Sequence, residues 1–81
     1  MLSSDMKRKC ELFDNLSISG LSRLRFAYND DNASIYSSPN DTYRVRLYHN
    51  SKPVNFGHYS TREEARKYRN AIIDYIYFVN L

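Results

Sequence analysis

The feature that constrains this chain most is a stretch in which apolar and basic side chains alternate. The two sets of positions between Thr42 and His49 are Tyr43, Val45 and Leu47 on one side, and Arg44, Arg46 and Tyr48 on the other. Successive side chains of a β-strand point to opposite faces of its sheet. This stretch therefore predicts a strand with one buried face and one solvated face that carries guanidinium groups.

The next segment predicts the strand that pairs with it. Val54 and Phe56 alternate inward between Pro53 and Tyr59, and Gly57 indicates a bulge or a close backbone approach. The connection at residues 50–52 is short, so the two strands are expected to form a hairpin.

A C-terminal helix follows the hairpin. Ser60 and Thr61 each lie three residues before a glutamate, Glu63 or Glu64, so either pair can make a capping box. The stripe that can cover the apolar face of the sheet consists of Ala65, Tyr68, Ile72, Tyr75 or Ile76, and Val79. The basic residues interpreted as the solvated face of this helix are Arg62, Arg66, Lys67 and Arg69.

Two further elements are expected before the hairpin. Apolar residues at steps of three and four between Ser4 and Leu16 predict a short amphipathic helix capped by Ser4 or Asp5, and residues 17–20 then read as a break. From residue 23 to Tyr28, apolar side chains alternate with Arg23 and Arg25, which predicts a first basic strand. A brief strand is also expected at residues 34–36, after a polar turn.

Together these elements predict an α+β fold in one small domain of 81 residues. Its expected parts are an N-terminal helical extension (1–20), a three- or four-stranded antiparallel sheet (21–59) and a C-terminal helix (60–80). The last turns of the final helix hold more apolar residues than one stripe needs, namely Ile73, Tyr77, Phe78 and Leu81. We expect the N-terminal helix or a second subunit to cover them, which leaves a homodimer open.

Several classes of protein do not fit the composition. The chain has no run of eighteen apolar residues and no basic stretch before an apolar one, so neither a membrane span nor a signal peptide is expected, and the predicted location is the cytoplasm. One cysteine, Cys10, and two histidines cannot make a disulfide or a four-ligand zinc site. Without a metal, a glycine-rich phosphate loop or a nucleophile set, we expect no cofactor and no enzymatic activity.

The hairpin and the helix start resemble a known pattern. The matching runs are Tyr43-Arg44-Val45-Arg46-Leu47, Val54-Asn55-Phe56-Gly57-His58-Tyr59 and Thr61-Arg62-Glu63-Glu64-Ala65, with Tyr68 three residues on. This order is similar to the plant ethylene-response-factor (Apetala-type) DNA-binding domain and its smaller phage and mobile-element relatives. The resemblance covers residues 35–75 and implies a three-stranded sheet, packed on one helix, whose other face enters the DNA major groove. It implies that Pro53, Asn55 and His58 project toward DNA, and of these Asn55 and His58 can hydrogen-bond a base edge.

The charge pattern predicts a similar partner independently of the resemblance. The formal net charge is +3, a modest excess that permits a nucleic-acid partner. Arginines at alternating positions of a strand can neutralise phosphates, and a β-ribbon fits the major groove. The predicted nucleic-acid-binding residues are Arg44, Arg46, Tyr48, Asn55, His58, Arg25, Arg23 and Lys52. The expected function is non-catalytic binding of double-stranded DNA, in a regulatory or accessory role of a phage or mobile element.

One alternative belongs to a different class of function. A phage-encoded protein-interaction module that inhibits a host nucleic-acid machine, for example an anti-CRISPR factor acting in the host-cell cytoplasm, could use the same basic and aromatic face or the apolar C-terminal helix. The stretch from Ser34 to Ser38 carries no arginine, which favours this alternative over DNA. The sequence leaves both partners open.

Overall fold

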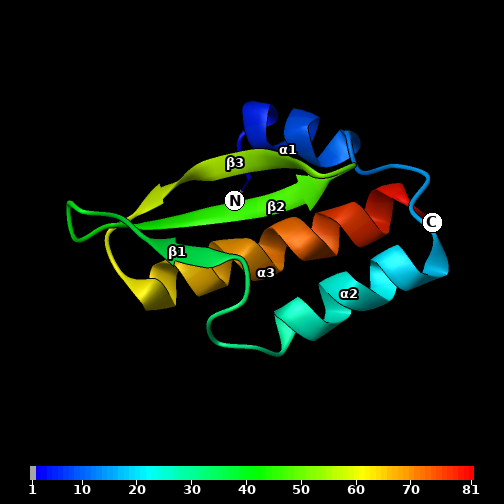
Figure 1. The fold of residues 1–81 in the computed structure, drawn as a ribbon. Coiled ribbons are helices and arrows are strands. Elements are labelled where there is room, and N and C mark those ends of the chain that lie inside the picture. The colour runs from blue at the N-terminus through cyan, green and yellow to red at the C-terminus, as the bar shows by residue number, and fades with distance from the viewer. Residues whose placement is uncertain (1) are drawn as a thin grey trace.

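The structure, a computed structural model, describes residues 2–81, so Met1 of the predicted N-terminal extension lies outside the described residues. The elements in chain order are α1 (Ser4–Glu11), α2 (Ile18–Tyr28), β1 (Ile35–Ser37), β2 (Tyr43–His49), β3 (Lys52–Tyr59) and α3 (Arg62–Val79). The three strands form one antiparallel sheet in the order β1-β2-β3 (Figure 1). The predicted α+β fold, with an antiparallel sheet and helices at both ends of the chain, is confirmed.

The β2–β3 hairpin owes its geometry to one tight turn and one bulge. Asn50 and Ser51 both have positive φ, 51° and 66°, and connect the paired residues His49 and Lys52, as in a two-residue type I′ turn. Farther along β3 the register shifts, so Gly57 is an extra residue with a φ of 104°. A glycine tolerates this conformation, which confirms the predicted bulge.

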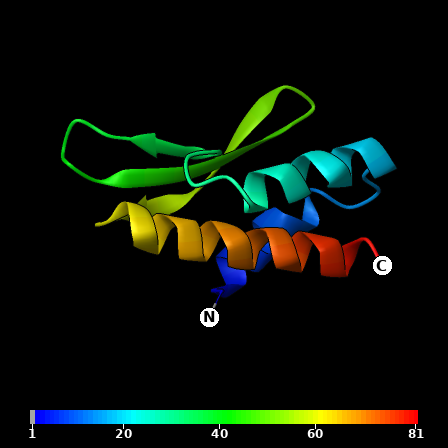
Figure 2. The ribbon, with the colours of Figure 1, turned by 90° about the horizontal axis from the view of Figure 1, so that it is seen from below.

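The core lies between the sheet and α3. Val45, Leu47 and Phe56 point from the sheet toward α3 and are buried together with the residues of its stripe, Ala65, Ile72 and Ile76. Figure 2 shows the strands on one side of the molecule and α3 on the other. Thr61 is the N-cap of α3, because its hydroxyl accepts a hydrogen bond from the amide of Glu64 at 3.0 Å. The burial thus follows the periods of two and of 3.6 residues in the sequence.

The helix α1 is shorter than predicted and begins at a different cap. It ends at Glu11, and its cap is Ser3, whose hydroxyl accepts from the Met6 amide at 3.2 Å. Cys10 is fully buried, as expected for a core thiol, and burial raises its pKa to about 11. The chain turns after α1, and the buried ring of Phe13 packs 6.3 Å from Phe56.

The predicted first basic strand is wrong. Residues Ile18–Tyr28 form the helix α2, with Ser17 as its N-cap, so the expected break at residues 17–20 is the start of a helix. Leu21, Leu24 and Tyr28 recur at steps of three and four and are half-buried, which is a helical period that overlaps the alternation read as a strand. The sheet therefore has three strands, and the predicted sheet segment 21–59 is wrong over its first eight positions.

The apolar end of α3 is covered in part by the chain itself. Ile73 is fully buried, and the Tyr77 hydroxyl donates to the carbonyl oxygen of Leu21 in α2. Phe78 and Leu81 remain 64% and 100% exposed. Ile73 is therefore not available to a second subunit, and a homodimer through Tyr77, Phe78 and Leu81 stays a prediction. Within residues 2–81, no helix combines the length and the apolar character that crossing a membrane requires.

Candidate nucleic-acid interface

The face of the sheet that points away from α3 carries seven side chains from all three strands, which we call the open face. Its residues are Tyr36, Arg44, Arg46, Tyr48, Pro53, Asn55 and His58. Tyr36 pairs with Arg44, and Arg44 pairs with His58, so these three lie in one row across the strands. In Figure 2, α3 and α1 lie on the other side of the sheet, and α2 lies beside it.

Arg46 is held in place at the centre of the open face. Its Nε donates to the side-chain oxygen of Asn55 on β3 at 3.1 Å, and its guanidinium lies 5.2 Å from the ring centre of Tyr36 on β1. A guanidinium has five N–H donors, so the four on the two terminal nitrogens stay available. The neighbours on both strands thus orient Arg46 without neutralising its charge.

Arg44 has even fewer partners. Its side chain is half-buried between the neighbouring strands, and its Nε is a buried nitrogen with no hydrogen-bond partner within residues 2–81. The ion pairs among those residues are Lys9 with Asp5 and Arg66 with Asp31. No described carboxylate therefore neutralises Arg44 or Arg46, and the two charges add on one face.

The remaining predicted residues of the sheet divide between its two faces. Tyr48, Asn55 and His58 are exposed on the open face, as expected. Lys52 pairs with His49, whose ring packs edge-on 5.2 Å from the buried Phe13. Residues directly opposite each other share a face, so Lys52 lies on the helix side of the hairpin end and the prediction that it flanks the open face is wrong.

Arg23 and Arg25 were expected on a strand of the same sheet and lie on α2 instead. Arg25 stacks on the ring of Tyr77 at 4.6 Å, away from the open face. Arg23 lines a groove of about 340 Å³ at the hairpin end, together with Tyr48 and Asn50. The same groove is lined by Phe13 and His49 from the helix side, so Arg23 lies at the hairpin end, and Arg25 lies away from the open face.

The arginines of α3 bind the turn between α2 and β1. Arg62 donates to the side-chain oxygen of Asn32 at 2.6 Å, and Arg66 pairs with Asp31 at 2.6 Å. Arg69 is 0% exposed, so its interpretation as part of a solvated face is wrong. The sequence does hold a signal for it, because Arg69 lies four residues after Ala65 and three before Ile72, on the buried stripe.

Arg69 makes its hydrogen bonds to the backbone of the same turn. Its terminal nitrogens donate to the carbonyl oxygens of Tyr28 at 3.2 Å, Ala33 at 2.9 Å and Asp30. Burial lowers the pKa of this guanidinium, and the nearby carboxylate of Asp30 opposes that shift. These bonds offset the cost of burying the charge, so Arg69 has a structural role.

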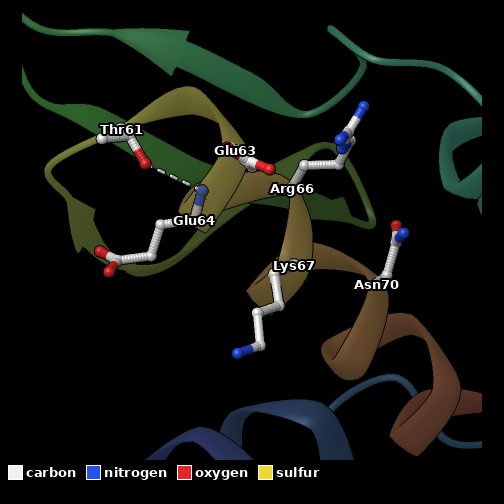
Figure 3. Close-up of a pocket in the computed structure, with 6 residues that line it drawn as sticks. All are labelled: Thr61, Glu63, Glu64, Arg66, Lys67 and Asn70. Carbon is white, nitrogen blue, oxygen red and sulfur yellow. Dashed lines mark hydrogen bonds between the residues drawn. The ribbon is translucent and has the colours of Figure 1, made fainter.

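A surface hollow of about 530 Å³ lies over the first turns of α3. Its lining residues are Thr61, Glu63, Glu64, Arg66, Lys67 and Asn70. Figure 3 shows their polar ends spreading apart, with the Thr61 hydroxyl bound to the Glu64 amide. Charges of both signs that do not converge cannot hold one ligand atom, so the open face is the stronger candidate. Across residues 2–81, no three histidine, cysteine or acidic side chains gather as metal ligands would.

Comparison with protein-family models, with curated proteins and with solved structures finds no match to this chain. The resemblance to the ethylene-response-factor domain therefore remains a prediction. The arrangement that it implies, three antiparallel strands packed on one helix, is present in β1, β2, β3 and α3. The helices α1 and α2 lie outside that pattern.

Proposed function

We propose that this protein binds double-stranded DNA without catalysis, through the open face of its sheet. One observation carries the proposal: Arg44 and Arg46 lie on an uncovered sheet face with no described carboxylate beside them. Phosphate contacts supply most of the non-specific affinity of DNA-binding proteins, and unpaired arginines supply such contacts.

The shape of the open face supports the same proposal. Neighbouring strands lie about 4.8 Å apart, so the outer two of three strands are separated by about 10 Å. The major groove is about 12 Å wide, and β-ribbons are known to occupy it. Arg44 and Arg46 would contact phosphates or guanine edges, and Tyr48, Asn55 and His58 would add polar and stacking contacts beside them.

The test compares two double variants that lose equal charge. Arg44→Ala/Arg46→Ala removes the two central cations, and Arg8→Ala/Lys67→Ala removes two exposed cations on helices. Binding of each protein to random duplex DNA is measured by fluorescence anisotropy at several salt concentrations. Each lost phosphate contact changes the log-log salt slope by about 0.9, so the first variant should lose about 1.8 in slope and about 60-fold in affinity at 0.1 M salt.

Comparison with the control variant Arg8→Ala/Lys67→Ala shows whether the loss is specific to the open face. A loss confined to Arg44→Ala/Arg46→Ala supports the open face as the DNA site. Equal losses in both variants, or wild-type protein that does not bind DNA, contradict the proposal.

A second candidate is a protein-interaction inhibitor of a host nucleic-acid machine, and the composition of β1 favours it. This strand contributes Tyr36 to the open face and no basic residue, so one of the three strands adds no positive charge to it. Aromatic and arginine side chains together are typical of protein interfaces. This candidate would be favoured if the wild-type protein does not bind DNA but binds a host protein, and if Arg44→Ala/Arg46→Ala no longer binds that host protein.

A further inference from the structure

The outer side of α2 carries large apolar side chains that the fold leaves uncovered. Ile18 is 86% exposed and Phe26 is 78% exposed, and none of the residues of α2 is buried. Among the helices and strands of residues 2–81, α2 packs against α3 alone, and it lies at the edge of the molecule (Figure 1). The side of α2 that points away from α3 is therefore open to another molecule.

A hollow lies between α2 and α3, beside Phe26. It measures about 280 Å³, and its lining residues are Ser22, Arg25, Phe26, Asn29 and Tyr77. The Tyr77 hydroxyl donates to the carbonyl oxygen of Leu21, which holds the ring that forms part of the wall. Pockets for whole small molecules begin at about 300 Å³, so this hollow has the size for one large side chain of a partner.

Arg25 places a positive charge at the wall of the hollow. Its guanidinium lies 4.6 Å from the ring centre of Tyr77 and 5.6 Å from that of Tyr28. These contacts with two rings orient the cation without neutralising it. No carboxylate in the described part of the chain forms an ion pair with Arg25.

The charges along α2 are all positive. The helix contains Arg23 and Arg25 and no aspartate or glutamate. At 3.6 residues per turn, the two arginines lie on opposite flanks of the stripe formed by Ile18 and Phe26. Arg23 shares its groove with Asp14, but the two make no ion pair. A complementary partner therefore carries negative charge on both sides of an apolar contact.

The acidic residues beside the C-terminal half of α2 have other contacts within the chain. Asp30 accepts hydrogen bonds from two backbone amides of the turn that follows α2, and Asp31 pairs with Arg66. Asp74 of α3 accepts from the Tyr28 hydroxyl at 3.5 Å. None of these three carboxylates forms an ion pair with an arginine of α2, so the positive charge of this surface is left for a partner.

We propose that the outer side of α2 binds an acidic segment of a partner protein. One large apolar side chain of that segment fills the hollow beside Phe26, and carboxylates on either side of it bind Arg25 and Arg23. Arginine and carboxylate can pair through two parallel hydrogen bonds, and an apolar anchor in a small pocket is typical of protein interfaces. This surface shares no residue with the open face, so the proposal does not depend on DNA binding.

The hollow and the stripe favour an acidic protein over other anionic partners. A nucleic-acid backbone has no apolar side chain for the hollow and would leave Ile18 and Phe26 without an apolar contact. A bilayer would cover the stripe, but it would also desolvate the polar side chains of Ser22 and Asn29, which line the hollow. A protein segment can fill the hollow and leave these polar groups at its hydrated rim.

The first test uses a fluorescein-labelled peptide that has glutamates on both sides of one central tryptophan. Fluorescence anisotropy measures its binding to the protein. Ser22→Trp fills the hollow from its own wall and should weaken binding about tenfold, as loss of an interface anchor does. Ser19→Trp places the same side chain on the same helix, outside the residues that line the hollow, and should bind as wild type does. A peptide with alanine in place of the tryptophan should also bind about tenfold more weakly.

The second test separates a specific charge contact from general attraction between peptide and protein. Arg25→Glu and Arg8→Glu change the net charge equally, and Arg8 is exposed on α1. Arg25→Glu should weaken binding of the glutamate peptide at least about tenfold, because it places like charges in contact. Arg8→Glu should weaken it less than about twofold at 0.15 M salt, where distant charges are screened. Arg44→Ala/Arg46→Ala should bind the peptide as wild type does.

Several outcomes would overturn the proposal. Wild type that does not bind the peptide would do so, and so would equal losses in Ser22→Trp and Ser19→Trp. A loss in Arg44→Ala/Arg46→Ala as large as in Arg25→Glu would mean that the peptide binds the open face instead. Wild type that binds vesicles of phosphatidylserine and phosphatidylcholine but not the peptide would assign α2 to a membrane surface. Ser22 and Ser19 are both exposed, so their variants test the hollow without a change in the core.

Discussion

The arginines of β2 and those of α3 carry the same charge and have opposite roles. Arg44 and Arg46 face outward from the sheet, and their only described partners are the amide of Asn55 and the ring of Tyr36, both bound to Arg46. Arg62, Arg66 and Arg69 all bind the turn between α2 and β1. No described carboxylate pairs with the first set, whereas Arg66 pairs with Asp31 and Arg69 donates to three backbone carbonyl oxygens.

The difference shows why a count of basic residues does not locate a binding surface. The whole chain has twelve lysines and arginines and a net charge of only +3. What distinguishes Arg44 and Arg46 from Arg66 and Arg69 is the absence of a carboxylate or backbone-carbonyl partner for their side chains among the described residues. An arginine whose N–H donors all bind groups within the chain has no donor available for a phosphate.

The largest expected effect is the loss of stability when Arg69 of α3 is replaced. Arg69→Met removes the donors to the carbonyl oxygens of Tyr28, Asp30 and Ala33 and should lower the free energy of unfolding by about 3 kcal/mol. Urea denaturation measures this change. Arg69→Lys keeps a charge but lacks the forked geometry and should lose a similar amount. If Arg69→Met costs less than about 1 kcal/mol, the turn does not depend on Arg69.

A smaller effect is expected where Asn55 positions Arg46. Asn55→Ala removes the acceptor of the Arg46 Nε–H, so the guanidinium gains freedom and DNA affinity should fall about fivefold, which corresponds to one hydrogen bond of about 1 kcal/mol. Anisotropy titration measures the affinity. The control is Asn40→Ala, at an exposed turn residue outside the sheet, which should bind as wild type does. Equal affinities for Asn55→Ala and wild type would show that Arg46 needs no such support.

The smallest effect is expected at the exposed ion pair of α3. Asp31→Asn neutralises the partner of Arg66, and the carboxylate of Asp31 is largely exposed, so the free energy of unfolding should change by less than about 0.5 kcal/mol. The same denaturation series measures it. A loss as large as that of Arg69→Met would mean that the ion pair, and not the buried guanidinium, holds the turn.

The sequence predicted the hairpin and α3 well because each has a clear period over many residues. Alternation from Tyr43 to Tyr48 fits a strand alone, and Thr61 with Glu64 marks a helix start. The run from Arg23 to Tyr28 is too short to distinguish the strand period of two residues from the helical period of 3.6. Its two arginines alternate with apolar residues, which favoured the prediction of a strand. Of the eight predicted site residues, Arg44, Arg46, Tyr48, Asn55 and His58 lie on the open face, whereas Arg23, Arg25 and Lys52 lie elsewhere.

By itself, the sequence determined which faces are apolar, because side-chain spacing within one element is a local property of the backbone. The tertiary structure alone decided which polar groups find partners inside the chain. Arg69 and the carbonyl oxygen of Tyr28 are 41 residues apart and meet only when α3 packs beside α2. Whether a charge is free or occupied depends on such distant contacts, and no local pattern specifies them.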